Sequence, residues 1–250
     1  MTLLEICVED GAGAAAAVAG GADRIELCSA LALGGLTPTT SLLEAALAHA
    51  RPAGVTVHAM VRPRAGDFAY ADADFALALA EGKALVAAGA DGLVFGACRD
   101  GALNEAQSRA WAECFGQQQT IAGKPIELSL HRAIDLVADK AAAVDMAVAL
   151  GFHRILSSGG AVSALEGAAV LREMVTRAAG RCRIAAGAGV RGGNVAQLLA
   201  QSGVDEVHAS ASRSAGAVDP LVVALGFDRG ERRMTCRDEV AALRQAIKPQ

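Results

Sequence analysis

The segment Gly21-Ala-Asp-Arg-Ile-Glu-Leu-Cys-Ser29 contains a pattern that the chain uses repeatedly. Its glycine favours the left-handed backbone conformation in which helices often end, and the aspartate then turns the chain. Ile25 and Leu27 alternate with polar residues, as in a strand with one face on a hydrophobic core. The segment therefore predicts the end of a helix, a tight turn and a buried strand in succession.

Three related phrases stand in front of other predicted strands. They are Gly89-Ala-Asp91, Gly151-Phe-His153 and Gly203-Val-Asp205. Together with Gly21-Ala-Asp23, they precede every second strand that we predict. This recurrence is typical of a barrel built from repeated pairs of strand–helix units.

Eight short stretches have the pattern of buried strands, and alanine-rich segments of helical length separate most of them. The stretches are Leu3–Glu9, Arg24–Ser29, Val55–Pro63, Gly92–Gly96, Pro125–Ala133, Arg154–Gly160, Arg183–Val190 and Glu206–Ser210. Eight such units match a (β/α)8 or TIM barrel, whose usual length is about 250 residues. We therefore predict an α/β protein with a single TIM-barrel domain over residues 1–250, and an open doubly wound sheet is the alternative. Ser212–Met234 is interpreted as an elaborated loop after the eighth strand.

The composition indicates the compartment and the classes of partner. No run of the chain reaches the roughly 18 apolar residues that a membrane span needs. Met1 leads directly into the first predicted strand without a signal peptide, so we expect a cytoplasmic protein without a membrane partner. The net charge is −4 and no basic stripe is present, so nucleic acid is not an expected partner. The six cysteines include no CxxC pair, which argues against a disulfide framework and a zinc ribbon.

Charged, hydroxyl and sulfur-containing residues occupy alternate positions along the predicted strands, so in each strand they lie on the same face. The inward set is Glu5, Cys7 and Glu9; Arg24, Glu26 and Cys28; His58, Met60, Arg62 and Arg64; Glu127, Ser129 and His131; and Glu206, His208 and Ser210. Because side chains alternate along a strand and the helix-facing side must be apolar, this set should point into the barrel. Buried charges must be paired, so we expect an ion-pair network of Arg24 or Arg154 with Glu26, Glu127 and Glu206 in the lower layers.

The upper layer suggests the mouth of an active site, because TIM-barrel chemistry lies at the carboxyl ends of the strands. The candidate catalytic residues are Glu9, Arg62, His131, Arg132 and His208. Glu9 or a histidine would move a proton, and the arginines would hold a carboxylate or phosphate. Pairing of the arginines with Glu9 and Glu26 is the structural alternative.

The loops after the seventh and eighth strands suggest a further site for an anion. They read Gly187-Ala-Gly-Val-Arg-Gly-Gly193 and Ser210-Ala-Ser-Arg213, which are rich in glycine and hydroxyl donors. Loops at these two positions often bind phosphate in this fold. Gly187, Gly189, Ser210 and Arg213 are therefore candidates for holding a small anionic metabolite. An isomerase, epimerase or lyase would fit such a mouth, and a scaffold without chemistry is a further alternative.

Several phrases along nearly the whole chain resemble the CutC family, which is named for copper homeostasis. They are Glu5-Ile-Cys-Val-Glu9, Gly21–Ser29, Gly34-Gly-Leu-Thr-Pro38, Val61-Arg-Pro-Arg-Ala-Gly-Asp-Phe68, Gly89–Gly96, His131-Arg-Ala-Ile-Asp135 and Glu206-Val-His208. The resemblance implies a (β/α)8 barrel, in agreement with the strand pattern, and a role in copper homeostasis. Whether the barrel forms a homo-oligomer is left open by the sequence.

The resemblance also implies two copper ligands, which correspond to Cys7 and Cys28 here. Both thiols have the inward parity, and they lie on predicted neighbouring strands about 4.8 Å apart. Thiolates are soft ligands that select Cu(I), and Met60 on the third strand would add a thioether. The alternative interpretation is that both cysteines are small buried hydrophobic residues.

Overall fold

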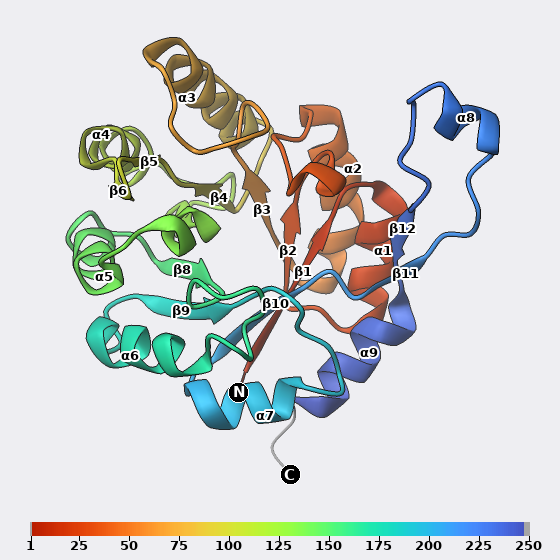
Figure 1. Ribbon diagram of the computed structural model, residues 1–250. Helices are drawn as coiled ribbons and strands as arrows, with labels where there is room; N and C mark the ends of the chain where they lie inside the picture. The colour runs from red at the N-terminus through yellow and green to blue at the C-terminus, as the bar shows by residue number, and fades with distance from the viewer. Residues whose placement is uncertain (1, 248–250) are drawn as a thin grey trace.

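The computed structural model describes residues 2–247, so Met1 and residues 248–250 of the expected domain lie outside the described residues. It contains a closed barrel of parallel strands in the order β1-β10-β9-β8-β7-β4-β3-β2 (Figure 1). The barrel strands are β1 (Leu3–Val8), β2 (Arg24–Leu27), β3 (Thr56–Met60), β4 (Gly92–Phe95), β7 (Glu127–Leu130), β8 (Arg154–Ser157), β9 (Arg183–Ala186) and β10 (Glu206–Ala209). The predicted TIM barrel is confirmed, and the closed strand order excludes an open doubly wound sheet.

Helices surround the barrel on its outer side (Figure 1). They are α1 (Gly11–Gly20), α2 (Thr40–Ala50), α3 (Asp72–Ala87), α4 (Glu105–Phe115), α5 (Lys140–Ala149), α6 (Ala168–Ala178), α7 (Val195–Ser202) and α9 (Arg237–Ala246), with the 3-10 turns η1 (Leu31–Leu33), η2 (Arg51–Ala53) and η3 (Arg132–Leu136). Leu4, Ile6 and Val8 of β1 are fully buried in the core between barrel and helices, with Ala14 and Ala17 of α1. Alanines on the inner face of α1 allow the helix to pack close to the sheet.

The repeated glycine phrase ends helices as predicted. The four glycines have positive φ angles, at Gly21 (92°), Gly89 (101°), Gly151 (80°) and Gly203 (72°). In three of these turns, the side chain two residues later accepts a hydrogen bond from a backbone N–H of the preceding barrel strand. These bonds are Leu4 N to Asp23 Oδ2 at 2.8 Å, Val57 N to Asp91 Oδ2 at 2.8 Å and Leu128 N to His153 Nδ1 at 3.1 Å. The phrase therefore ties each turn to the neighbouring strand, which explains why His153 can replace an aspartate.

Charged side chains fill the lower part of the barrel and compensate one another. Arg24 forms ion pairs with Glu5 and Glu206. Arg154 pairs with Glu206 at 3.0 Å and with Glu127 at 2.7 Å. The predicted network is thus present around both arginines, although Glu5 rather than Glu26 is the carboxylate bound by Arg24. Because these charges are paired, they fill the interior without leaving an isolated ion.

Two small ribbons interrupt the alternation of strands and helices. β5 (Cys98–Arg99) pairs with β6 (Ala102–Leu103) between β4 and α4. The predicted loop Ser212–Met234 is instead an arm in which β11 (Ser212–Ser214) pairs with β12 (Arg233–Thr235), with α8 (Pro220–Ala224) between them.

The arm projects away from the barrel (Figure 1). Its two ends meet, because the backbone N–H of Cys236 donates a hydrogen bond to the carbonyl oxygen of Ala211 at 2.9 Å. Along residues 2–247, no helix has both the length and the apolar character required to cross a bilayer.

Candidate functional site

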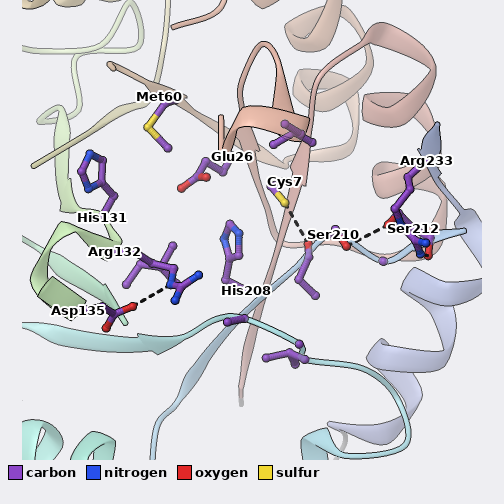
Figure 2. A pocket seen from close by; sticks show the side chains of 18 of the residues that line it. Cys7, Glu26, Met60, His131, Arg132, Asp135, His208, Ser210, Ser212 and Arg233 are labelled. Carbon is purple, nitrogen blue, oxygen red and sulfur yellow. Dashed lines mark hydrogen bonds and ion pairs between the residues drawn. The ribbon is translucent and has the colours of Figure 1, made fainter. Parts of the chain in front are cut away.

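A cavity of about 670 Å³ lies at the carboxyl ends of the barrel strands. Cys7, Glu26, Met60 and His208 are among its lining residues, and Figure 2 shows their side chains around one shared space. They come from β1, β2, β3 and β10, which are consecutive neighbours in the barrel. The closed sheet therefore brings together residues that are up to about two hundred positions apart in the chain, as the inward parity predicts.

His208 and Glu26 give this end of the cavity acid–base groups. The Nδ1 atom of His208 lies 2.7 Å from Oε1 of Glu5, which fixes the orientation of the imidazole. Burial lowers the pKa of His208, but the acidic groups of Cys7, Glu26 and Glu5 outweigh it and hold this pKa well above its ordinary value. Burial raises the pKa of Glu26 to about 7. One ligand atom each of Glu5, Glu26 and His208 lies within 4.8 Å of the others, close enough to share a cation.

The two predicted copper ligands occupy different environments. Cys7 lines the cavity and is 8% exposed, whereas Cys28 is fully buried and does not line it. The Sγ atom of Cys28 lies 3.6 Å from Oε1 of Glu26 and packs with Met60 and Val94. Burial, followed by the charge of Glu26, raises the pKa of the Cys28 thiol well above its ordinary value. Cys7 faces Glu26 in the β1–β2 register, so Cys28 is the next inward residue beyond this pair.

Arg62 and His131 form one wall of the cavity, together with Phe68. The guanidinium of Arg62 donates to the carbonyl oxygens of Leu33 (2.8 Å), Gly35 (3.1 Å) and Gly66 (2.7 Å). The structural alternative expected Arg62 to pair with an acidic residue. Its guanidinium instead donates hydrogen bonds only to backbone carbonyl oxygens among the described residues. Its side chain is held rigidly by backbone groups from two loops.

His131 is a neutral imidazole in this wall. Its Nδ1 atom accepts a hydrogen bond from the backbone N–H of Ala133 at 3.1 Å. Burial, and then the charge of Arg62, lowers the pKa of His131 to about 3. The ring of Phe68 covers it, with 4.7 Å between the ring centroids. His131 is thus suited to hydrogen bonding rather than to carrying a charge.

Arg132 and Asp135 fasten η3 to the loop after β8. Arg132 donates to Oδ2 of Asp135 at 2.8 Å and to the hydroxyl of Ser158 at 3.0 Å (Figure 2 shows the first contact). Asp135 also accepts hydrogen bonds from the hydroxyl of Ser157 at 2.6 Å and from the backbone N–H of Gly160 at 3.1 Å. Asp135 lines the cavity. It belongs to the His131–Asp135 phrase quoted above, but the sequence did not indicate that it joins η3 to the loop after β8.

Glu9, one of the candidate catalytic residues, does not line the cavity. β1 ends at Val8, and Glu9 turns to solvent, where its carboxylate accepts a hydrogen bond from the backbone N–H of Leu31 at 2.7 Å. Its position is the consequence of a strand that is one residue shorter than predicted. The other four candidates, Arg62, His131, Arg132 and His208, all line the cavity.

The candidate anion site is brought together only in part. Gly189 and Ser210 line the cavity, but Gly187 and Arg213 do not. A Cβ atom on Gly187 would lie 2.7 Å from the side chain of Leu156, so this glycine serves packing. Arg213 is exposed on β11 and does not line the cavity.

Arg191 and Arg233, which the sequence analysis did not propose, line the cavity, whereas Arg213 does not. Arg233 donates to the hydroxyl of Ser212 at 2.9 Å and to its carbonyl oxygen at 2.6 Å (Figure 2). Arg191 belongs to the glycine-rich loop that the sequence singles out. The alternation of residues along the barrel strands could not have indicated Arg233, because this residue lies on β12, the second strand of the arm.

Comparisons with known proteins agree on one family. The sequence profile of the CutC family matches residues 2–213, which ends within β11. A CutC family protein of Sinorhizobium medicae is 45% identical over 98% of this chain and 96% of its own length. A copper homeostasis protein cutC homolog of Caenorhabditis elegans is 37% identical over 98% of this chain and 95% of its own length. The crystal structure of CutC from Streptococcus agalactiae superposes with a TM-score of 0.77 at 27% identity, covering 84% of this chain and 99% of that one. The chain belongs to the CutC family.

Proposed function

We propose that this protein binds Cu(I) through Cys7 and Cys28 and serves copper homeostasis in the cytoplasm, as a single TIM-barrel domain. The observation that supports the proposal is the register of β1 and β2, in which Cys7 lies opposite Glu26 and Cys28 is the next residue of the same parity after Glu26. The name of the relative from Caenorhabditis elegans, a copper homeostasis protein, supports the assignment of the metal.

The donor set around Cys28 fits a soft metal ion. Met60 packs against Cys28, so a thioether and a thiol lie in contact beside the cavity that Cys7 lines. Thiolate and thioether ligands select Cu(I) over harder cations. A Cβ atom on Gly35 would lie 3.0 Å from the Cys28 sulfur, so the turn at Gly34–Gly35 packs over this thiol. Copper would reach Cys28 from the cavity by movement of this turn or of Met60.

The test is an anaerobic titration with Cu(I) against a competing chelator. We expect one tightly bound ion per chain in the wild type and its loss in the Cys7→Ala/Cys28→Ala double variant. Cys182→Ala is the matched control, because Cys182 is a buried thiol that does not line the cavity. Weak binding that the double variant leaves unchanged would sink the copper role.

An acid–base enzyme of the isomerase, epimerase or lyase type is the second candidate. The cavity volume of about 670 Å³ favours it, because this space accommodates an organic molecule and far exceeds a bare ion. Glu26 and His208 are the groups that would transfer protons there. Thermal-shift screening of phosphorylated and carboxylated metabolites tests this candidate, and a substrate turned over by the Cys7→Ala/Cys28→Ala variant would separate it from copper binding.

A further inference from the structure

We propose that Arg62 and His131 form a binding site for the carboxylate or phosphate group of a small organic molecule, with the ring of Phe68 as a movable cover. The site is on the cavity wall formed by these three residues. It uses neither Cys7 nor Cys28, so it stands independently of the proposed copper ligands. Within the second candidate function, it would bind the anionic group of the substrate.

The first reason is a buried positive charge without a negative partner. Arg62 is 6% exposed, and within residues 2–247 it forms no ion pair. Its partners are three carbonyl oxygens, which orient the guanidinium but leave its full charge in place. The buried arginines Arg24 and Arg154 are both neutralised by glutamates. Arg62 is thus the exception among these three, and it lies on the cavity.

The second reason is a pair of N–H donors without acceptors. The Nδ1 atom of His131 accepts from Ala133, so its hydrogen in the neutral ring is on Nε2. This Nε2 is buried and has no hydrogen-bond partner, and the same holds for Nε of Arg62. Buried donors without acceptors are rare in proteins. Two of them on one wall, beside an uncompensated cation, match an oxyanion and disfavour a metal ion.

The ring of Phe68 packs against both side chains on this wall. Its ring lies 4.7 Å from the His131 ring centroid and 4.9 Å from the guanidinium carbon of Arg62. The ring is only partly buried and lines the cavity. A rotation of this side chain would uncover both donors, and the stacking on Arg62 and His131 that is lost would be replaced by two charge-assisted hydrogen bonds. The cover therefore predicts that removal of the ring strengthens binding.

The experiment is calorimetric titration of the full chain with inorganic phosphate and with acetate, and glycerol is the neutral control. We expect binding of at least one of the two anions, and the stronger one identifies the phosphate or carboxylate class. His131→Ala should weaken binding by at least about tenfold, whereas His131→Gln, which keeps an N–H donor, should weaken it less. Phe68→Ala should strengthen it severalfold.

Arg62→Met should abolish binding, and Arg177→Met is its matched control. Arg177 carries the same charge but is exposed on α6 and does not line this cavity. If Arg62→Met does not fold, the opposite effects of Phe68→Ala and His131→Ala still test the site. The proposal is overturned if neither anion binds to the wild type or to Phe68→Ala, or if His131→Ala binds as tightly as the wild type. The Cys7→Ala/Cys28→Ala variant should retain anion binding. Failure of the anion site can therefore be distinguished from failure of the copper proposal.

Discussion

His131 illustrates how three neighbours determine the chemistry of one imidazole. The N–H of Ala133 occupies Nδ1, the Phe68 ring covers one side, and the charge of Arg62 opposes a second positive charge. A histidine in water gains a proton near pH 6.5. Here burial and Arg62 lower the pKa to about 3, so the ring stays neutral throughout the physiological range.

This neutral histidine makes the stability of the fold depend on pH. Between about pH 6.5 and pH 3 the unfolded chain binds a proton at His131 and the folded chain does not, so the free energy of unfolding decreases as the pH falls. From pH 7.5 to pH 5.5, the wild type should lose about 1 kcal/mol more than His131→Gln. Urea unfolding at both pH values measures the difference. His49→Gln, at an exposed position, should follow the wild type, and equal losses in wild type and His131→Gln would refute the prediction.

At the scale of elements, the alternation of side chains predicts much of the barrel but less of the site. The polar parity along β1, β2 and β10 correctly places Glu5, Glu26 and His208 inside, because a strand has a fixed period. It does not predict which inward residues reach the cavity, since loops decide this. Cys28 lies under the Gly34–Gly35 turn, and Glu9 is diverted to the N–H of Leu31.

The turns between elements also have a chemical role that glycine spacing alone does not predict. Asp91 accepts a hydrogen bond from the backbone N–H of Val57, a fully buried residue of β3. Asp91→Ala should lower the free energy of unfolding by about 1–3 kcal/mol, because this N–H loses its acceptor. Asp91→Asn keeps an acceptor oxygen and should cost clearly less. Denaturant unfolding of both variants checks this, and equal costs would contradict the role of the hydrogen bond.

At the scale of the whole molecule, the ion pairs in the barrel interior join strands that are distant in sequence. Arg24 of β2 binds Glu5 of β1 and Glu206 of β10, and Glu206 also binds Arg154 of β8. The composition and parity of the strands predict such a network, because unpaired charges inside a barrel are too costly. The choice of partners depends on the closed strand order, which no local pattern contains.

Removal of the central arginine should therefore destabilise the whole barrel. Arg24→Met removes the cation that two buried carboxylates share, leaving Glu5 with His208 and Glu206 with Arg154, and should lower the free energy of unfolding by about 3–5 kcal/mol. Arg109→Met removes an exposed ion pair with Glu105 on α4 and should cost less than about 1 kcal/mol. Circular dichroism during urea unfolding compares them. A similar, small cost in both variants would show that the network does not hold the barrel together.

The arm after β10 has a consequence for protein engineering. It leaves and rejoins the barrel at Ala211 and Cys236, which are hydrogen-bonded to each other, and its base brings Ser212 and Arg233 to the cavity. The last backbone contact of the ribbon joins Ala215 to Arg232. The segment 216–231 beyond that contact is suited to insertion of a peptide or a whole domain, because both of its ends are held by the ribbon. A longer loop adds little to the entropic cost of closing it. A reporter placed there would be joined through the ribbon to Ser212 and Arg233 at the cavity without interrupting a barrel strand.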